Sequence, residues 1–513
     1  MALTFFRREP LTLDACSTPT TRSRALPVEP APQRIDAPLP YPSAFEMSAP
    51  GTTENPLRVA IIGAGPSGFY AAEHILKDEG THAQVDLFDR LPTPFGLVRG
   101  GVAPDHPKIK SVIRVYEKTA AREGFRFFGN VKVGHDIDVS DLERLYHAIV
   151  FTVGCETDRR LEIPGEELPG SHAATAFVGW YNAHPDYADE EFDLTCERAV
   201  VIGNGNVAMD VARMLALTDR ELRETDTAEH AIEMLGGNKV SEIVVLGRRG
   251  PVQAAFTNPE IRELGEMHDA DVVVDPSEVE LDPASQAFLD SDEADKTTRV
   301  NVETLRDFSQ RTPEGKPKRI VLRFLSSPVE ITGEGKVEGI VIGHNELISE
   351  DGALRARDTG ERSELECGLV LRSVGYTGIP IEGVPFDDQK GTILNDGGRV
   401  LDSHDGGQKT GHYTAGWIKR GPSGVIGTNK KDALETVRHL LDDVGTGTLL
   451  EPANPEPAAV EELLSEREIR FISFEDWQAI DEAEVGRGEP HGRPRVKFVR
   501  VEEMFDALGE RVG

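Results

Sequence analysis

Two glycine-rich segments carry the clearest chemistry in this sequence. The first spans residues 63–68 (GAGPSG) and follows an apolar run at 57–62, which predicts a buried strand. Residues 69–76 predict a helix, and 84–89 predict a second strand. A lone glycine motif is weak evidence. Placed between a strand and a helix, with an acid ending the next strand, it indicates dinucleotide binding.

Each residue type in this first segment has a physical role in holding a pyrophosphate. Gly63 permits a tight turn, Gly65 lets backbone amides approach the phosphates, and Gly68 allows close packing of helix against strand. The helix N-terminus faces the phosphates with its partial positive charge. Asp89 can accept hydrogen bonds from ribose hydroxyls. The alternative is an ordinary strand–helix turn with packing glycines.

A second segment, 203–208 (GNGNVA), repeats the device with Gly203, Gly205 and an alanine in the third place. The acid is missing here, because the next strand ends in Arg248 and Arg249. Two guanidiniums bind a 2′-phosphate that an acid would repel, so we expect this site to prefer NADPH to NADH. The alternative is a solvated arginine pair at a strand end.

Two dinucleotide sites in one chain have an economical explanation. One holds a resident flavin dinucleotide and the other takes a visiting nicotinamide, which carries hydride. Flavin accepts the electron pair and can release electrons singly. FAD and NADP(H) are therefore the expected cofactors.

Composition narrows the class of protein. The 513 residues are 38% apolar, which suffices for a globular core, and no apolar stretch is long enough to predict a transmembrane helix. The formal net charge of -33 argues against nucleic acid and anionic membranes as partners. None of the four cysteines forms a C-x-x-C pair, which disfavours an iron–sulfur cluster, a zinc ribbon and a dithiol redox pair. We expect no metal site and a cytoplasmic location.

The two ends of the chain differ from its centre. Residues 1–56 hold ten of the 33 prolines and little periodic apolar pattern, so we expect a disordered Pro-rich leader. A transit peptide is disfavoured by its acidic residues, and a true start at Met47 is the plainer hypothesis. Residues 458–513 are expected to be helical, with a short basic patch at 491–497.

Four long, ordered motifs resemble the adrenodoxin-reductase type of ferredoxin–NADP+ reductase. They are 92–110 (PTPFGLVRGGVAPDHPKIK), 203–210 (GNGNVAMD), 247–256 (GRRGPVQAAF) and 416–429 (GWIKRGPSGVIGTN). The C-terminal stretch resembles bacterial members of that family.

The resemblance implies an α/β fold with two Rossmann-like domains, the NADP domain inserted into the FAD domain, and a C-terminal helical extension. The implied bounds are 57–154 and 375–450 for the two parts of the FAD domain, 155–374 for the NADP domain and 451–513 for the extension.

The resemblance also implies cofactor contacts. Those expected for FAD are Ser67, Asp89, Leu97, Val133, Trp417, Gly424, Val425 and Ile426. Those expected for NADP are Asn204, Gly205, Asn206, Val207, Arg248, Arg249, Glu260 and Arg159. Two positions depart from the family pattern: Asp89 stands where glutamate is common, and Phe95 stands where close relatives have tryptophan.

His106 and Glu263 are the residues expected beside the reacting rings. His106 lies in a rigid Pro-flanked turn, and Glu263 follows Glu260 by three residues, which places both on one helix face. An ion pair between them would orient the nicotinamide and tune the flavin environment. Because hydride transfer needs no acid or base, we expect these residues to modulate the rate. The alternatives are a structural loop histidine and a helix-surface acid.

A basic segment suggests where a protein partner docks. Residues 98–130 contain seven basic and three acidic residues, a local balance of +4 in a strongly acidic chain. An acidic ferredoxin could dock there, with Lys108, Lys110 and Arg114 as contacts. A solvated amphipathic helix face is the alternative.

The expected activity is that of an FAD-dependent ferredoxin–NADP+ oxidoreductase. Hydride would pass between NADPH and FAD, and single electrons would then pass to or from ferredoxin. One alternative is an NADPH diaphorase or oxidase whose acceptor is a quinone or oxygen. Another is a nucleotide-binding regulatory protein with no turnover.

Overall fold

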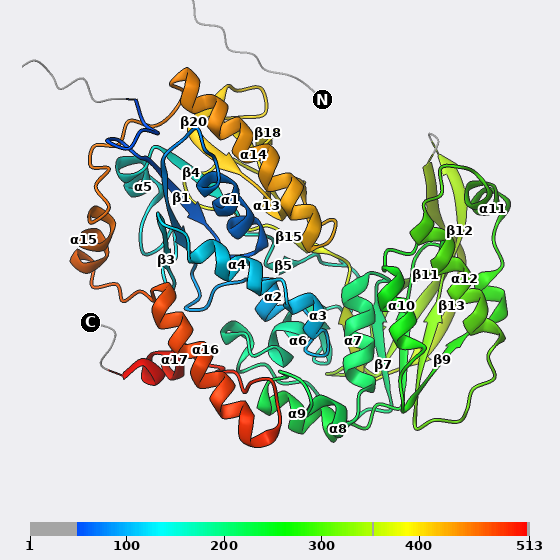
Figure 1. The fold of residues 1–513 in the computed structure, drawn as a ribbon. Helices are drawn as coiled ribbons and strands as arrows, with labels where there is room; N and C mark the ends of the chain where they lie inside the picture. The colour runs from blue at the N-terminus through cyan, green and yellow to red at the C-terminus, as the bar shows by residue number, and fades with distance from the viewer. Residues whose placement is uncertain (1–48, 351–352, 510–513) are drawn as a thin grey trace, which may run out of the picture. The chain divides into compact units, whose positions relative to one another are not determined.

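The computed structural model describes residues 49–350 and 353–509 (Figure 1). The expected leader at 1–56 and the possible start at Met47 fall almost entirely outside these residues, so both stay predictions. None of the helices in the described part is long and apolar enough to cross a membrane.

A seven-stranded sheet forms the first half of the fold. Its strands are β1 (Leu57–Ile62), β2 (Ala83–Phe88), β3 (Phe125–Phe128), β4 (Ala148–Phe151), β18 (Asn395–Asp396), β19 (Arg399–Leu401) and β20 (Gln408–Thr414). Their order is β18-β19-β20-β4-β1-β2-β3, parallel from β20 to β3 and antiparallel at the β18–β19 edge.

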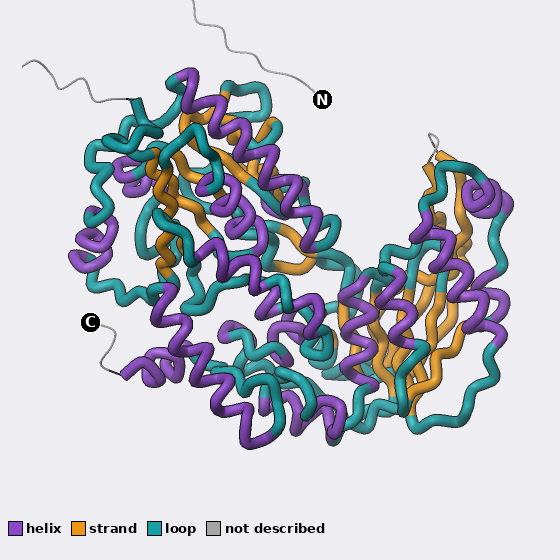
Figure 2. Tube along the Cα trace, in the orientation of Figure 1, coloured by secondary structure: helices purple, strands orange, loops and turns teal. Residues whose placement is uncertain are grey.

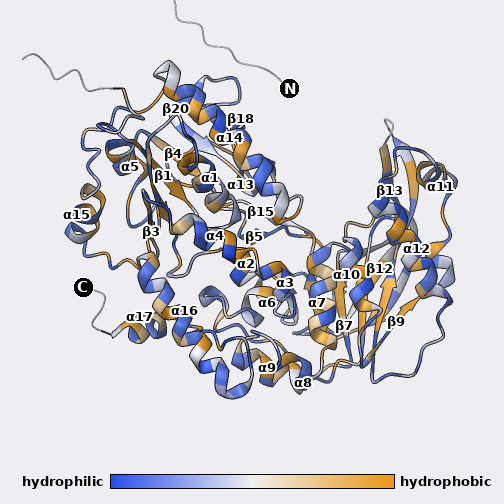
Figure 3. Cartoon of the chain, viewed as in Figure 1, coloured by the Kyte–Doolittle hydropathy of each residue, from blue (hydrophilic) through white to orange (hydrophobic). Residues whose placement is uncertain are grey.

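Strand β1, in the interior of this sheet, is apolar apart from Arg58, because both of its faces are covered. Leu57, Val59 and Ile61 belong to one buried cluster, and Ala60 and Ile62 belong to another. This is the pattern of a parallel strand buried on both sides. The strands of the two large sheets accordingly carry mostly hydrophobic colour in Figure 3.

Helices surround this sheet. They are α1 (Pro66–Leu76), α2 (Leu97–Gly100), α3 (Pro107–Lys110), α4 (Ile113–Ala120), α5 (Val139–Leu145), α13 (Trp417–Arg420) and α14 (Ile426–Thr446). The long helix α14 packs beside α1, as Figure 1 shows. The first glycine turn therefore opens into a helix that a second helix holds in place.

A six-stranded, all-parallel sheet forms the second half (Figure 2). Its order is β6 (Ser171–Ala173), β14 (Leu369–Arg372), β7 (Arg198–Ile202), β8 (Glu242–Leu246), β10 (Lys318–Arg323) and β9 (Ala270–Val274). The helices of this half are α6 (Ala174–Tyr181), α7 (Asn206–Ala216), α8 (Asp219–Leu222), α9 (Glu229–Gly236), α10 (Asn258–Leu264), α11 (Pro283–Asp290) and α12 (Lys296–Gln310). Short 3-10 turns lie at Pro185–Tyr187, Pro251–Gln253 and Pro276–Val279.

Small antiparallel sheets complete both halves of the fold, a three-stranded sheet in the second half and a two-stranded sheet in the first. β11 (Ser326–Thr332), β12 (Gly339–Glu350) and β13 (Ala353–Glu366) form one of them. β16 (Phe386–Asp387) pairs with β17 (Thr392–Ile393).

Two short strands join the two halves. β5 (Thr157–Asp158) pairs antiparallel with β15 (Tyr376–Thr377), next to the points where the chain leaves and re-enters the first half. All strands of the second sheet lie in sequence between them. The expected fold class, two Rossmann-like units with one inserted in the other, is confirmed. The domain bounds stay predictions.

The C-terminal region is helical. It contains α15 (Ala459–Glu466), α16 (Phe474–Gly488), a 3-10 turn at Glu489–His491 and α17 (Val501–Leu508). Ile472 bridges to Gly129 through two backbone hydrogen bonds, and Trp477 of α16 packs edge-on against Phe95 at a centroid distance of 5.8 Å. The extension is thus bonded into the first half.

Candidate active site between the two glycine turns

One cavity of about 2280 Å³ is lined by both glycine turns. Every residue expected to contact a cofactor lines it, except Gly68. A Cβ at position 68 would lie 2.2 Å from the carbonyl oxygen of Gly63, so Gly68 serves helix–strand packing behind the cavity wall. The two expected sites are therefore parts of one space.

The first turn has the geometry that a pyrophosphate needs. Gly63 has a φ of 106°, and a Cβ there would lie 2.7 Å from the carbonyl oxygen of Thr152. Gly65 caps α1, and a Cβ on it would meet nothing within 4 Å. That open space before a helix N-terminus is where phosphate oxygens would approach the backbone amides.

Asp89 follows the end of β2, as expected, and faces the cavity. Its carboxylate accepts hydrogen bonds from the backbone amides of Ala64 at 2.7 Å and Leu91 at 2.9 Å. Burial outweighs these bonds and raises the pKa of Asp89 to about 6. Each carboxylate oxygen keeps acceptor capacity for a ribose hydroxyl.

The residues expected around the flavin ring come together in the same cavity. Leu97 and Val425 are large apolar side chains, yet they are 39% and 53% exposed. The indole Nε1 of Trp417 is buried without a hydrogen-bond partner among the described residues. A largely apolar ring system that carries hydrogen-bond acceptors would cover Leu97 and Val425 and accept a hydrogen bond from Nε1 of Trp417. The residues present therefore fit FAD. Ser67, Val133, Gly424 and Ile426 also line this region.

The second turn repeats the geometry of the first. Gly203 has a φ of 131°, and a Cβ there would lie 2.0 Å from the carbonyl oxygen of Ser373. Gly205 caps α7, and its Cβ direction is open. Asn204, Asn206 and Val207 line the cavity beside it, and the Asn206 side chain also accepts a hydrogen bond from the Thr257 amide at 2.8 Å.

Arg248 and Arg249 lie just past β8 at the edge of this cavity. Burial, then the charge of Arg248, lowers the pKa of Arg249. Across 49–350 and 353–509, neither guanidinium forms an ion pair with a carboxylate. Two neighbouring cations without a counter-charge fit a bound 2′-phosphate. Arg159 lies at the junction of the two halves, where its backbone amide donates to the Gly375 carbonyl oxygen at 2.9 Å.

His106 and Glu263 meet as expected, with Nε2 of His106 2.6 Å from Oε2 of Glu263. Burial disfavours the imidazolium, but the bond to Glu263 and the nearby carboxylates outweigh it and raise the pKa of His106. The bond from His106 lowers the pKa of Glu263, which stays 39% exposed. Both shifts favour the imidazolium–carboxylate form of the pair.

Sequence reasoning missed the charges that surround this pair. Arg213 of α7 bonds Asp105 at 2.6 Å and Asp210 at 2.7 Å. The sequence could have indicated Asp210, which ends one of the family motifs, and Asp105, which precedes His106. It gave no indication of Arg213. Arg213 therefore neutralises part of the carboxylate cluster around His106, whose members are scattered along the sequence.

Glu260 lies within this cluster, with Oε2 3.8 Å from His106 and 3.6 Å from Arg213. Burial, then the charge of Asp210, raises the pKa of Glu260 to about 7. Its Oε2 has no hydrogen-bond partner among the described residues and lines the cavity, which fits the expected nucleotide contact. His106, Asp210 and Glu260 have the spacing of a cation site. The Arg213 guanidinium already supplies positive charge there, so we assign no metal.

The docking residues differ in exposure. Lys108 and Arg114 are exposed. Lys110 is not: both carboxylate oxygens of Asp226 hold its Nζ, at 2.7 and 2.9 Å, and its side chain is 12% exposed. Lys110 is therefore wrong as a docking residue, because the sequence could not show that a buried partner binds it.

Two glycine turns on one cavity, one beside an acid and the other beside an arginine pair, define a flavoprotein that works with a nicotinamide nucleotide. Residues 57–264 match the pyridine nucleotide-disulphide oxidoreductase family. The chain is 50% identical over 453 residues to the NADPH-ferredoxin reductase FprA of Mycobacterium leprae, covering 87% of this chain and 97% of that protein. It is 41% identical over 476 residues to the human mitochondrial NADPH:adrenodoxin oxidoreductase, covering 89% and 93%.

A solved structure of Mycobacterium tuberculosis FprA in complex with NADPH has a TM-score of 0.83 and 48% identity, covering 89% of this chain and all of that one. The chain belongs to the adrenodoxin-reductase type of the ferredoxin–NADP+ reductase family, and the resemblance seen in the sequence is confirmed.

Proposed function

We propose that the protein is an FAD-dependent ferredoxin–NADP+ reductase that passes electrons between NADPH and an acidic ferredoxin. The observation that carries this proposal is the single cavity onto which both glycine turns open. When bound, FAD supplies the exchange between a two-electron hydride donor and a one-electron carrier. The relatives named NADPH-ferredoxin reductase and adrenodoxin oxidoreductase support the same assignment.

The chain's own residues bind and orient the two dinucleotides. The first turn and Asp89 would hold FAD, and the second turn would hold NADPH, with Arg248 and Arg249 placed to neutralise a 2′-phosphate. The His106–Glu263 pair faces the same cavity and sets the local charge. Because hydride transfer needs no proton acceptor, this pair adjusts the rate rather than making the reaction possible.

Ferredoxin docks, in this proposal, on the surface formed by Lys108, Ile109, Arg114 and Val115. Two of these residues are basic, and the other two are among the exposed large apolar side chains of the described residues. Lys108 and Ile109 also line the cavity that would hold the flavin. A surface that mixes cations with apolar side chains fits an acidic protein partner. The cytoplasmic location stays a prediction.

Anaerobic stopped-flow spectroscopy tests the central assignment. The purified protein should carry the visible flavin band, and NADPH should bleach it much faster than NADH. Ferredoxin should then restore the band, and competition with a quinone and with oxygen identifies the preferred acceptor. Absence of flavin, or no bleaching by either nucleotide, would leave only a nucleotide-binding protein.

A further inference from the structure

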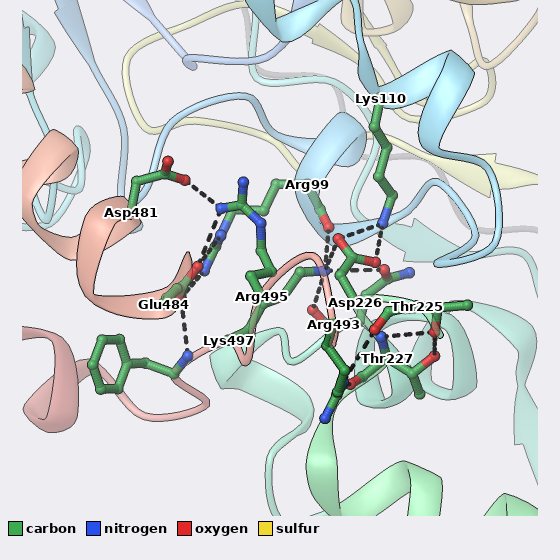
Figure 4. A network of polar contacts seen from close by, with 12 residues as sticks. Arg99, Lys110, Thr225, Asp226, Thr227, Asp481, Glu484, Arg493, Arg495 and Lys497 are labelled. Atoms are coloured by element: carbon green, nitrogen blue, oxygen red, sulfur yellow. Dashed lines mark hydrogen bonds and ion pairs between the residues drawn. The ribbon is translucent and has the colours of Figure 1, made fainter. Parts of the chain in front are cut away.

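A buried junction of three charged residues joins three distant parts of the chain (Figure 4). Its centre is Asp226, which lies in the loop between α8 and α9. Asp226 binds Nζ of Lys110, the last residue of α3, and Nζ of Lys497 from the C-terminal extension at 3.2 Å. Burial opposes the charged lysines, and their joint attraction lowers the pKa of Asp226.

Lys497 extends the junction to the expected flavin site. Its side chain is 1% exposed, and its Nζ donates to the carbonyl oxygens of Arg99 and Asn182, each at 3.2 Å. Arg99 belongs to α2, which begins at the expected flavin contact Leu97. Asn182 follows α6 in the second half. With Asp226 included, the three N–H donors of the ammonium are directed to both halves of the fold.

Helix α16 of the C-terminal extension also binds α2. The guanidinium of Arg99 makes two hydrogen bonds to Glu484, at 2.8 and 2.6 Å, and lies 4.9 Å from the ring centroid of Trp477. Glu484 is fully buried and also accepts from the backbone amide of Phe498 at 2.9 Å. A buried ion pair therefore connects the extension with α2, and Asp226 links the extension to α3 by pairing with both Lys497 and Lys110.

The loop that carries Asp226 is itself held by the extension. Arg493 donates to the carbonyl oxygens of Thr225, at 3.2 Å, and Thr227, and to the Glu229 carboxylate. The sequence predicted a basic patch at 491–497, and Arg493 and Lys497 are instead buried and paired, because their partners lie more than two hundred residues away.

These contacts fix α3 at both ends. His106 caps its N-terminus and pairs with Glu263 of α10, while Lys110 at its C-terminus pairs with Asp226. Both carboxylates belong to the nucleotide-binding half, and α3 belongs to the flavin-binding half. Burying ion pairs adds little net stability, because desolvation offsets the attraction, but it selects one geometry.

We propose that the Lys110–Asp226–Lys497 junction positions α2 and α3 against the nucleotide-binding half and so sets the alignment between flavin and nicotinamide. The three residues act through His106 and the α2 backbone and are positioning residues. This inference rests on the proposed function.

Two single variants of the holoenzyme test it, Lys110→Met and Lys497→Met. Each leaves Asp226 with one lysine, so each keeps a neutral pair in the core. We expect flavin bleaching at saturating NADPH to slow by about tenfold, because small misalignments of reacting groups are costly. Reoxidation of the dithionite-reduced protein by ferricyanide should change less than about twofold, since it needs no nicotinamide.

Hydrogen exchange supplies a readout independent of turnover. The amides of Lys110 and Ser111 donate to His106 and Pro107 within α3, so the peptide containing them should exchange faster in Lys110→Met. Arg500→Met is the matched control, because Arg500 also joins the extension to the second half, through an exposed ion pair with Asp189. It should change neither exchange nor bleaching.

A purely structural junction gives a different result. Lower melting temperatures, with bleaching within about twofold of wild type and unchanged exchange in α3, would overturn the proposal. If Lys497→Met fails to retain flavin, Lys110→Met decides alone, since it leaves the extension bound. Failure of NADPH to bleach the wild type would reject the proposed function, and the exchange measurement would still test the junction.

Discussion

At the residue scale, Asp89 is a carboxylate that accepts hydrogen bonds from two backbone amides and keeps further acceptor capacity. Its pKa, raised to about 6 by burial, applies without FAD. Ribose hydroxyls donate to the ionised carboxylate, so FAD binding favours the ionised form. The affinity of the apoprotein for FAD should therefore fall as the pH drops through about 6 and hold steady above it.

Fluorescence titration of the apoprotein with FAD between pH 5.5 and pH 8 measures this. Asp89→Asn should bind FAD about tenfold more weakly at pH 8, the cost of losing a charged acceptor, and show no comparable fall on acidification. The same pH profile in both proteins would mean that another group governs FAD affinity.

The His106–Glu263 pair gives a second prediction at this scale. The raised pKa of His106 contributes stability below its unfolded value of 6.5, which is lost as pH rises through the folded pKa. The lowered pKa of Glu263 contributes stability above its unfolded value of 4.5. The pair contributes in full only between these values. Glu263→Gln should therefore lower the melting temperature more at pH 6 than at pH 9.

Thermal unfolding of the two proteins at both pH values is the measurement. Glu266→Gln is the control, because Glu266 is an exposed acid just beyond the same helix. A deficit of equal size at both pH values would show that no ion pair forms.

At the scale of elements, we expect the two glycines in the turn between β7 and α7 to have different roles, Gly203 in folding and Gly205 in nucleotide binding. A Cβ at Gly203 would meet the Ser373 carbonyl oxygen at 2.0 Å, and its φ of 131° disfavours any other residue. A Cβ at Gly205 meets no protein atom, and its φ of -95° suits alanine. Gly203→Ala should lower the melting temperature, whereas Gly205→Ala should fold normally and obstruct the pyrophosphate.

Calorimetric titration with NADP+ and thermal unfolding together check this pair. Gly205→Ala should weaken NADP+ binding by about tenfold or more, since a methyl group displaces phosphate oxygens from the backbone amides. Unaltered binding in Gly205→Ala would place the pyrophosphate elsewhere. Bound FAD should be retained in both variants.

The parts of the fold that could be predicted from the sequence are those marked by local patterns. Residues 57–62 and 198–202 form strands as expected, because continuous apolar runs beside glycine turns specify buried parallel strands. Arg213, Asp226 and Lys497 could not be placed, since each has a partner more than one hundred residues away and no periodicity marks a buried ion pair. The meeting of His106 and Glu263 was expected from the Pro-flanked turn that presents His106 and from the position of Glu263 one helical turn after Glu260.

On the scale of the whole molecule, the net charge of -33 makes a local excess of basic residues, such as that at 98–130, significant for partner binding. The proposed docking surface at Lys108 and Arg114 would attract an acidic ferredoxin that the net charge of the chain repels. Lys108→Glu should lower the rate of ferredoxin reduction about three- to tenfold, mainly through slower association, and leave ferricyanide reduction unchanged.

Steady-state kinetics with both acceptors, at low and high salt, measures the effect. Lys336→Glu is the control, an exposed lysine of the second half. Equal loss with both acceptors, or an equal effect of the control, would remove Lys108 from the docking surface.

The pairing of β4 with β20 has a consequence for synthesis on the ribosome. Thr414 donates to the Phe151 carbonyl oxygen across 263 residues, so β4 emerges long before its neighbour. Every strand of the second sheet is translated in between. The inserted sheet therefore completes its hydrogen bonding first, while the nascent chain carries an unpaired apolar strand edge. The nucleotide-binding half thus has all strands of its sheet available for pairing before the flavin-binding half does.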